Sequence, residues 1–295
     1  MAEQDPSAPA LFDMSALTPT APQSSFMDLE SPGYAYMFGF LQADGHLARG
    51  TGQKGKLSVE INARDTHILY EFQRLTPYYS SITERVRSTN LAEQHHSATW
   101  SLCSLEARTL IHKLGIPYGK KSRIIRPPRV EFSRPDYLRG VIDADGSLGW
   151  TAEGLPFLSF TSASTALAAY LCHYAKKVTG TERIARRNNR DQVYVITYYK
   201  EQAQQLAEHL YYPGCLALDH KKGNAASIQT WVRPADMKFA PPRKRWTKAD
   251  DRELLRIGTP PPPRPSHSTA PSRAAPCDCG ASVADRHRCP EPQFP

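Results

Sequence analysis

Three features are scarce in this sequence: long apolar runs, basic residues near the N-terminus, and cysteine. No apolar run approaches the roughly 18–20 residues that a membrane-spanning helix needs, which argues against an integral membrane protein. The first thirty residues contain no Lys or Arg, whereas secretory signals and mitochondrial transit peptides both need basic residues. The six cysteines are scattered and do not form a disulfide framework. We therefore expect a protein of a reducing compartment, intracellular and cytoplasmic.

The composition favours a folded, basic protein. With 40% hydrophobic and 22% charged residues, the chain is close to the globular average. Its 295 residues correspond to about two domains. The 37 basic and 29 acidic residues give a net charge of +8, which weakly favours a polyanionic partner because Lys and Arg make most phosphate contacts.

The two ends differ in composition from the middle. Residues 1–30 are acidic, rich in Pro, Ala and Ser, and show no helical or strand period, which predicts disorder. Twelve of the 25 prolines fall in the last 56 residues, including the run at 260–263. We expect residues 259–295 to form a Pro-rich disordered tail, which leaves a folded region of about 31–235.

Two smaller features lie beyond the folded region. Residues 236–258 are predicted to be a basic linker, and 243–255 resemble the first helix of a Myb-like DNA-binding module, without the rest of that module. The tail also carries four side chains of the types that bind zinc, at a spacing unlike the usual Cys-x₂-Cys pairs. These are Cys277, Cys279, His287 and Cys289.

The folded region contains an internal repeat. The segment YMFGFLQADG at 36–45 recurs as YLRGVIDADG at 137–146, so that Asp145 follows Asp44 by 101 residues. Each copy is apolar until a carboxylate and a glycine, which predicts a buried helix that ends abruptly. Gly45 and Gly146 suit the left-handed position just past a helix end.

The segments that follow each copy also correspond. After the first copy we expect a strand at 57–61, a helix at 65–75, strands at 82–87 and 99–102, and a helix at 106–114. After the second we expect a strand at 157–161, a helix at 164–178, a hairpin of 183–187 with 193–198, and a helix at 201–210. The predicted fold class is therefore α+β, with two pseudo-symmetric α-β-β-α-β-β-α repeats at 31–132 and 133–235.

Small residues at helical spacing would let the two repeated helices pack closely. These helix-interface candidates are Gly39, Ala43, Gly140 and Ala144. Parallel packing would bring Asp44 and Asp145 together at the negative ends of both helix dipoles, where two carboxylates repel each other. A hard divalent cation such as Mg²⁺ would offset that repulsion, and sites of this kind can hydrolyse phosphodiesters. A single Asp-Gly is usually only a helix stop, but two copies in matched context favour the metal site.

Residues 138–146 resemble the signature of the LAGLIDADG homing endonucleases, and 37–45 resemble a second, more divergent copy. The resemblance implies a single-chain, sequence-specific endonuclease that hydrolyses one phosphodiester on each strand of a long double-stranded DNA site and acts as a monomer. It implies two antiparallel sheets that form a DNA-binding saddle, with the motif helices packed at the centre. It assigns Mg²⁺, for which Mn²⁺ can substitute, to Asp44 and Asp145. Gln42 departs from the motif at a position that is not a metal ligand.

Two further stretches, at 114–122 and 210–222, resemble those that carry a basic residue near the active centre of this family. The resemblance implies Lys121 and Lys221 as catalytic residues that organise water or stabilise charge. Their neighbours Lys120 and Lys222 remain alternatives, and all four can instead be solvated loop lysines.

Basic residues near the predicted strands are candidates for DNA contacts. The first repeat offers Lys54, Lys56, Arg85 and Arg87, and the second offers Arg183, Arg186, Arg187 and Arg190. The usual explanation of such charges is a solvated face.

Other functions remain open. A DNA-binding regulator of the same fold that does not cleave is one alternative, although a pure binder has no need of two adjacent carboxylates. An RNA-splicing maturase with intron RNA as its partner is another. A nuclease embedded in an intein is disfavoured, because the sequence lacks a terminal His-Asn splice junction.

Overall fold

The computed structural model describes residues 25–50, 52, 54–89, 92–238, 247–249 and 252. The chain divides into two compact units, Met1–Met237 and Lys238–Pro295, and every helix and strand named below lies in the first. The predicted Pro-rich tail, the zinc ligands and most of the Myb-like helix lie outside the described residues. Among the described residues, no helix combines the length and the apolar character that crossing a membrane requires.

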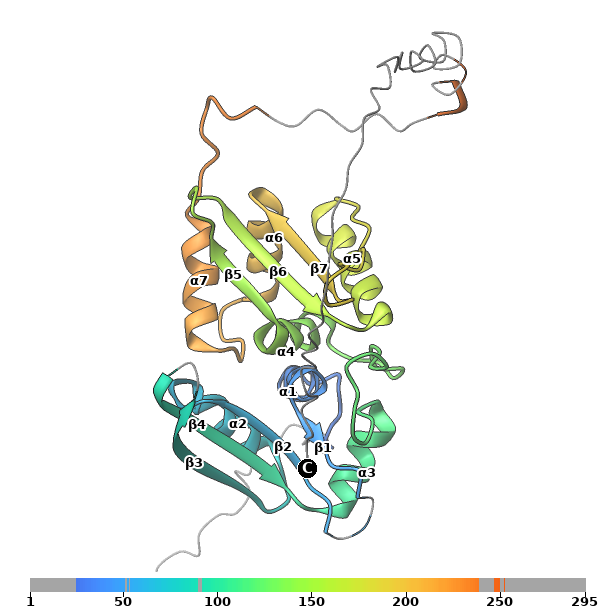
Figure 1. Ribbon diagram of the computed structural model, residues 1–295, viewed down its shortest axis with the longest axis vertical. Coiled ribbons are helices and arrows are strands. Elements are labelled where there is room, and N and C mark those ends of the chain that lie inside the picture. Colours follow the sequence, from blue (N-terminus) through green and yellow to red (C-terminus); the bar gives the residue numbers. More distant parts are fainter. Residues whose placement is uncertain are drawn as a thin grey trace, which may run out of the picture. The chain divides into compact units, whose positions relative to one another are not determined.

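The first repeat has the predicted order of elements (Figure 1). They are α1 (Pro32–Ala43), β1 (His46–Leu47), β2 (Leu57–Asn62), α2 (His67–Leu75), β3 (Ser80–Thr89), β4 (Ala92–Leu102) and α3 (Leu105–Leu114). The strands form an antiparallel sheet in the order β1-β2-β4-β3. The α3 helix is capped at its N-terminus by Ser104, whose side chain accepts a hydrogen bond from the Ala107 amide, and at its C-terminus by Gly115, with φ of 126°.

The second repeat departs from the prediction. Its elements are α4 (Arg134–Asp145), β5 (Gly146–Trp150), β6 (Pro156–Ser162), α5 (Thr165–Thr179), β7 (Tyr194–Tyr199), α6 (Glu201–Leu210) and α7 (Asp219–Gln229). Its antiparallel sheet has three strands in the order β5-β6-β7. The α+β class and the antiparallel sheets are confirmed, but this repeat lacks one predicted strand and gains one helix.

The missing strand is the one predicted at 183–187, where only an isolated bridge joins Arg187 to Tyr194. That segment has one large apolar side chain, Ile184, which is 79% exposed. Pairing it along β7 would therefore bury little apolar surface, and the predicted strand is wrong. Of the predicted hairpin there remain this antiparallel bridge and a hydrogen bond from the Asn188 amide to the Val193 carbonyl oxygen.

The predicted disorder at 1–30 is also wrong for residues 25–30. Met27 and Leu29 are 4% and 2% exposed and belong to the hydrophobic core. The Leu29 carbonyl accepts a hydrogen bond from the Ser133 amide, just before α4. This short segment therefore joins the start of one motif helix to the start of the other.

The two motif helices, α1 and α4, pack against each other at the centre of this unit (Figure 1). A Cβ placed on Gly39 would lie 2.2 Å from the Tyr137 carbonyl oxygen. A Cβ placed on Gly140 would lie 2.2 Å from the Tyr36 carbonyl oxygen. Only glycine permits this approach of the two backbones, and it brings the C-terminal ends of both helices together.

Gly45 and Gly146 do not adopt the expected left-handed conformation. Gly146 has a φ of −111°, and Gly45 is not among the glycines with positive φ. Glycine is needed at both for lack of space, because an added Cβ would lie 2.5 Å from the Leu41 oxygen and 2.8 Å from the Ile142 oxygen. The predicted left-handed conformation of these two glycines is therefore wrong, and close packing is the reason for glycine at both positions.

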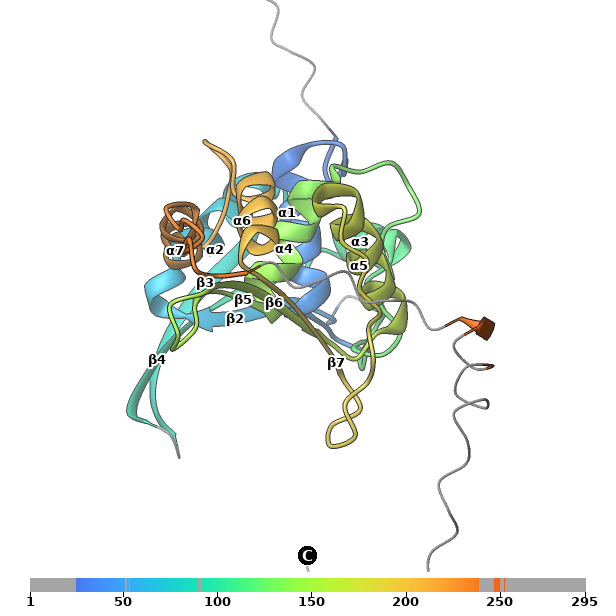
Figure 2. The ribbon, with the colours of Figure 1, turned by 90° about the horizontal axis from the view of Figure 1, so that it is seen from above.

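Figure 2 shows how the layers of this unit are arranged. The helices of both repeats cover one face of the two sheets, and the opposite faces form an arch with β3 and β4 on one side and β7 on the other. The C-terminal ends of α1 and α4 lie toward the open side of this arch, where each helix is followed by a strand of its sheet, β1 or β5.

Candidate active site

Two carboxylates occupy equivalent positions at the ends of the motif helices. Asp44 caps the C-terminus of α1, and Asp145 is the last residue of α4. Partial removal from water and the charge of Asp44 raise the pKa of Asp145 to about 6, against the opposing effect of Lys121 and Lys221. Partial desolvation also raises the pKa of Asp44, and the same two lysines oppose it. These four side chains therefore form one electrostatic cluster, at the negative ends of two helix dipoles.

The two lysines bind the last turns of the motif helices. Lys121 Nζ donates to the carbonyl oxygens of Gln42, at 2.6 Å, and Ala43 in α1. Lys221 Nζ donates to the carbonyl oxygens of Ile142 and Asp143 in α4, at 2.8 and 2.6 Å, and to Gly146 at 2.9 Å. Both lysines are 8% exposed. They donate to carbonyl groups at the C-terminal ends of the helices, and one of these, the Ile142 oxygen, also accepts a hydrogen bond from the Gly146 amide. They also bring positive charge to the carboxylates.

Burial lowers the pKa of both lysines, and the neighbouring carboxylates only partly compensate. For Lys121 the pKa falls to about 8, with Asp145 and Asp44 opposing the effect of desolvation. For Lys221 the opposing charges are those of Asp143, Asp44, Asp145 and Asp65. Lys120 and Lys222, the alternatives left by the sequence, are exposed side chains.

We expect Lys121→Met and Lys221→Met to lower the free energy of unfolding by about 1–3 kcal/mol each, since each leaves buried carbonyl oxygens without a donor. Lys120→Met and Lys222→Met are matched controls and should stay within about 0.5 kcal/mol of the unsubstituted protein. Urea denaturation of the five proteins measures both effects. Equal stabilities across all five would contradict the capping role.

Hydrogen bonds cross the helix pair at a second pair of equivalent positions. Tyr36 donates its hydroxyl proton to Asp143 at 2.8 Å, and Tyr137 donates to the Gln42 side-chain oxygen at 2.5 Å. The Gln42 amide also donates to the Arg126 carbonyl oxygen at 2.9 Å. The position at which the first motif departs from the family pattern is therefore buried, and Gln42 and its counterpart Asp143 each accept a hydrogen bond from a tyrosine of the other motif helix.

Asp143 is held by two more donors. Tyr211 Oη donates to it at 2.6 Å and the Leu218 amide at 2.9 Å. Burial raises the pKa of Asp143, against the opposing effect of these hydrogen bonds. This network was not predicted from the sequence, although both motif copies begin with the same residue type, Tyr.

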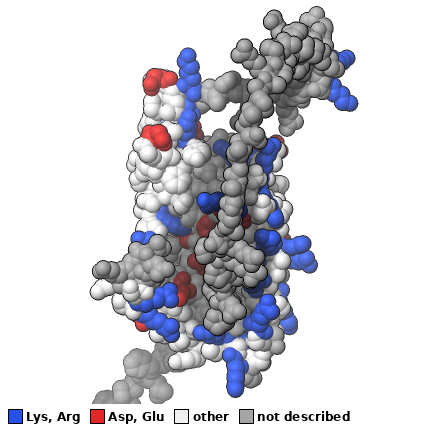
Figure 3. Space-filling view, in the orientation of Figure 1, with Lys and Arg blue, Asp and Glu red and all other residues white. Residues whose placement is uncertain are grey.

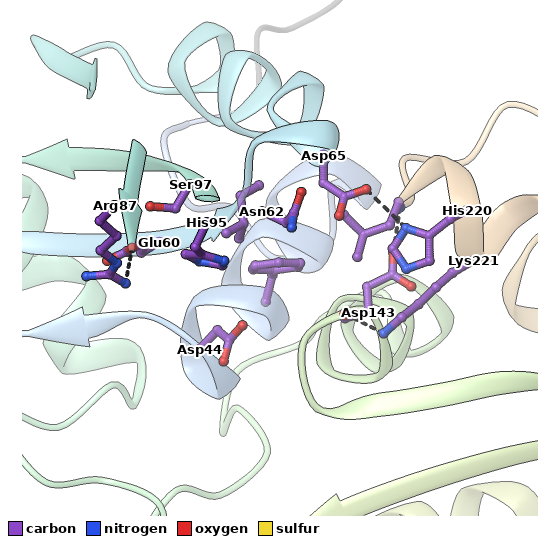
Figure 4. A pocket seen from close by; sticks show the side chains of 13 residues that line it. Asp44, Glu60, Asn62, Asp65, Arg87, His95, Ser97, Asp143, His220 and Lys221 are labelled. Atoms are coloured by element: carbon purple, nitrogen blue, oxygen red, sulfur yellow. Dashed lines mark hydrogen bonds and ion pairs between the residues drawn. The ribbon is translucent and has the colours of Figure 1, made fainter. Parts of the chain in front are cut away.

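A hollow of about 430 Å³ opens beside Asp44 and is lined by both repeats (Figure 4). On one wall the Asp65 carboxylate lies 3.0 Å from His220 Nδ1. This pair joins the segment just before α2 to the start of α7. His67 Nε2 lies 3.7 Å from the Asp219 carboxylate and reinforces the same junction. Lys221, next to His220, points toward Asp143 in this view. These pairs fix the helix that supplies Lys221, and neither histidine was a predicted site residue.

Basic residues of the first repeat gather on the open face of its sheet. Lys56 and Arg85 line a second hollow of about 430 Å³ that also contains Asp44. Arg87 lines the first hollow and pairs with Glu60 at 2.8 Å. Lys54 is exposed in the turn before β2 and lines neither hollow.

The candidates of the second repeat are placed differently. The Arg183 guanidinium lies 5.1 Å from the centre of the Tyr198 ring and donates a hydrogen bond to the Gln202 side chain. The Arg187 guanidinium lies 5.2 Å from the centre of the Tyr194 ring and donates a hydrogen bond to the Thr165 hydroxyl. Tyr198 is buried against the helices, and Thr165 begins α5. The structure therefore does not bring Arg183 and Arg187 to the open face. Arg190 pairs with Asp191 at 2.9 Å, and Arg186 is exposed in the same loop.

The donor set at the helix ends fits a hard divalent cation. Within the described part of the chain, no three His, Cys, Asp or Glu side chains lie close enough together to hold a metal. The carboxylates of Asp44 and Asp145 repel each other and lack a full hydration shell, which a cation would relieve. Mg²⁺ is commonly held by one or two carboxylates, with water and phosphate oxygens as the other ligands.

Comparison with known proteins gives one match in sequence and several in structure. The family model of the LAGLIDADG-like domain matches residues 135–211, which confirms the resemblance seen in the second repeat. A search of curated proteins finds no match.

Similar solved structures include the homing endonuclease I-WcaI bound to its DNA recognition sequence, with 14% identity, a TM-score of 0.49 and coverage of 72% of this chain and 95% of that chain. They also include the I-SmaMI LAGLIDADG homing endonuclease bound to cleaved DNA, with 15% identity, a TM-score of 0.44 and coverage of 68% of this chain and 87% of that chain.

Proposed function

We propose, from the match of residues 135–211 to the LAGLIDADG-like domain, that the chain is a sequence-specific endonuclease that hydrolyses one phosphodiester on each strand of double-stranded DNA. The observation that carries the proposal is the meeting of Asp44 and Asp145 at the ends of two packed, repeat-related helices, with two buried lysines beside them. Because one chain contributes both carboxylates, a monomer suffices.

In this proposal Asp44 and Asp145 hold Mg²⁺, or Mn²⁺ in its place. When bound, such a metal supplies an activated water and charge stabilisation at the phosphate. Lys121 and Lys221 hold positive charge close to both carboxylates, where negative charge develops on the phosphate oxygens. Water is the nucleophile, so no covalent bond forms between the protein and DNA.

The open side of the arch is the proposed DNA surface. It leads directly to Asp44, and Lys56, Arg85 and Arg87 on the first sheet supply positive charge there. The two sheets lie on either side of α1 and α4, whose ends carry the carboxylate pair (Figure 1), which suits a long target contacted on both sides of the cleavage positions.

The direct test is incubation of the full chain with a library of randomised duplex sites in Mg²⁺ and, separately, Mn²⁺. We expect selective cutting of both strands at a small set of related sequences. Tight, selective binding without cutting in either metal would overturn the nuclease and favour a regulator of the same fold. Binding of structured RNA with no DNA binding would favour a maturase.

Cation binding should depend on pH through Asp145. Because its pKa is raised to about 6, this carboxyl holds a proton below pH 6 that a cation must displace. We expect Mg²⁺ affinity to be about tenfold weaker at pH 5 than at pH 7. Calorimetric titration of the protein without DNA measures this, and Asp145→Asn should weaken binding and reduce the pH dependence, leaving only the part that Asp44 contributes. An affinity that does not change between pH 5 and 7 in the unsubstituted protein would contradict the assignment.

A further inference from the structure

The sheet of the second repeat has an open face without charge. Its strands β5, β6 and β7 contain no charged and no amide side chain. In the cross-strand register, Phe157 pairs with Tyr199, Ser159 with Thr197, and Thr161 with Val195. These six residues alternate with buried neighbours such as Leu158 and Phe160, so they share the face away from the helices.

Apolar groups on this face are accessible. Val195 is 52% exposed and Tyr199 is 42% exposed. The surface over β5 and β6 is largely white in Figure 3, whereas blue side chains gather on the lower part of the molecule and along its right edge. The face is continuous with the active site, because β5 begins at Gly146, directly after Asp145.

The corresponding face of the first sheet is chemically different. Glu60 is opposite Thr99, Arg85 is opposite Ser97, and Arg87 is opposite His95. Charged and hydrogen-bonding side chains thus line the first sheet at positions where the second sheet has hydroxyl, aliphatic and aromatic groups.

The two kinds of side chain recognise different base pairs. In the major groove, Arg and Lys bind the O6 and N7 atoms of guanine, and Glu accepts from the cytosine amino group. Apolar groups contact the 5-methyl group of thymine, and Ser and Thr bond to any base edge. A face of Phe, Val, Thr and Tyr therefore has means to select thymine and no side chain suited to selecting guanine.

We propose that the two repeats recognise half-sites of different composition: β5, β6 and β7 select an A·T-rich half-site through thymine methyl groups, and the first sheet selects a half-site with G·C pairs through Arg85 and Arg87. This inference rests on the proposed binding of duplex DNA by the open side of the arch. It goes further by naming the base chemistry on each side of the cleavage positions.

The test replaces atoms of the DNA rather than of the protein. A binding site for the full chain is first selected from randomised duplex DNA, and selection with Arg85→Ala identifies which half the first repeat contacts. Thymine is then replaced with uracil in one half at a time, which removes the methyl group and keeps the base pair. We expect the dissociation constant to rise about fourfold for each contacted thymine in the second half, as for loss of one buried methyl group. Uracil in the first half should change it less than twofold.

A pair of protein variants links the effect to the sheet. Val195→Ala should reduce the preference for thymine over uracil, because it removes methyl groups from the open face. Ile184→Ala should keep that preference, because Ile184 is 79% exposed but lies outside the strands.

The selection and the uracil substitutions distinguish a wrong assignment of the half-sites from a wrong assignment of the function. Selective binding with a G·C-rich second half, or with no response to uracil there, would overturn the inference and leave the nuclease standing. Absence of any selected duplex sequence would overturn the proposed function, and the inference with it.

Discussion

Replacement of Asp44 or Asp145 with Asn is expected to lower the rate of DNA cleavage by about 10²–10⁴-fold, while sequence-selective binding stays within a few-fold. Each substitution removes one carboxylate of a pair that is proposed to hold the metal, and metal-ion charge stabilisation contributes several kcal/mol to such reactions. Single-turnover cleavage of the selected duplex in Mg²⁺ measures the rate, and a gel-shift titration in Ca²⁺ measures binding.

Thermal unfolding separates the loss of a ligand from the loss of the fold. Because partial desolvation raises the pKa of Asp145 to about 6, its ionised form is less favourable in the folded chain than in the unfolded chain. Stability contributed by this group is therefore present at low pH and lost as pH rises through 4 to 6. In chelator at pH 7, Asp145→Asn should unfold at the same or a higher temperature than the unsubstituted protein. Added Mg²⁺ should raise the unfolding temperature of the unsubstituted protein by more than that of Asp145→Asn.

Glu153→Gln is a suitable control, since it removes an exposed carboxylate in the turn between β5 and β6. Its cleavage rate should match that of the unsubstituted protein. Cleavage at the full rate by both Asn variants would show that the paired carboxylates are not the metal ligands.

The elements with a strong local pattern were predictable from the sequence. The motif helices were found because an apolar run with small residues recurs after 101 residues, and β2 because Leu57 and Val59 face the core between polar neighbours. By contrast, α7 buries only Lys221, Ala225 and Ile228. A helical face that begins with a lysine carries no hydrophobic signal, so this helix was missed.

What the sequence could not provide is contact between distant residues. Tyr36 and Asp143 are 107 positions apart, and Asp65 and His220 are 155 apart. Nothing local distinguishes these side chains from ordinary polar residues until the fold brings the repeats together. The same holds for Arg183 and Arg187, whose charge suggested a DNA surface but whose neighbours are Tyr198 and Tyr194.

The second large effect is expected at the crossing of the motif helices. Gly39→Ala would place a methyl group 2.2 Å from the Tyr137 carbonyl oxygen, and Gly140→Ala would place one 2.2 Å from that of Tyr36. In both cases the obstacle is backbone, which cannot move aside unless the helices separate. We expect each substitution to lower the free energy of unfolding by about 3 kcal/mol or more, at the upper end for overpacking. That corresponds to a fall of roughly 6–12 °C in Tm.

Gly223→Ala provides the opposite expectation in the same protein. Gly223 lies within α7, and a Cβ there would meet no atom within 4 Å. Alanine should therefore raise stability by about 0.5–1 kcal/mol, since glycine loses more chain entropy on folding into a helix. If Gly39→Ala and Gly223→Ala unfold at the same temperature, the close approach of α1 and α4 does not exclude a larger side chain at residue 39.

The crossing also determines the active site, because the spacing of α1 and α4 sets the spacing of Asp44 and Asp145. A Gly39→Ala variant that remains folded at low temperature must hold its helices farther apart. We therefore expect it to bind Mg²⁺ more weakly than the unsubstituted protein, although no ligand has been changed. A variant that loses stability but keeps full Mg²⁺ affinity would show that the carboxylates adjust independently of the helices.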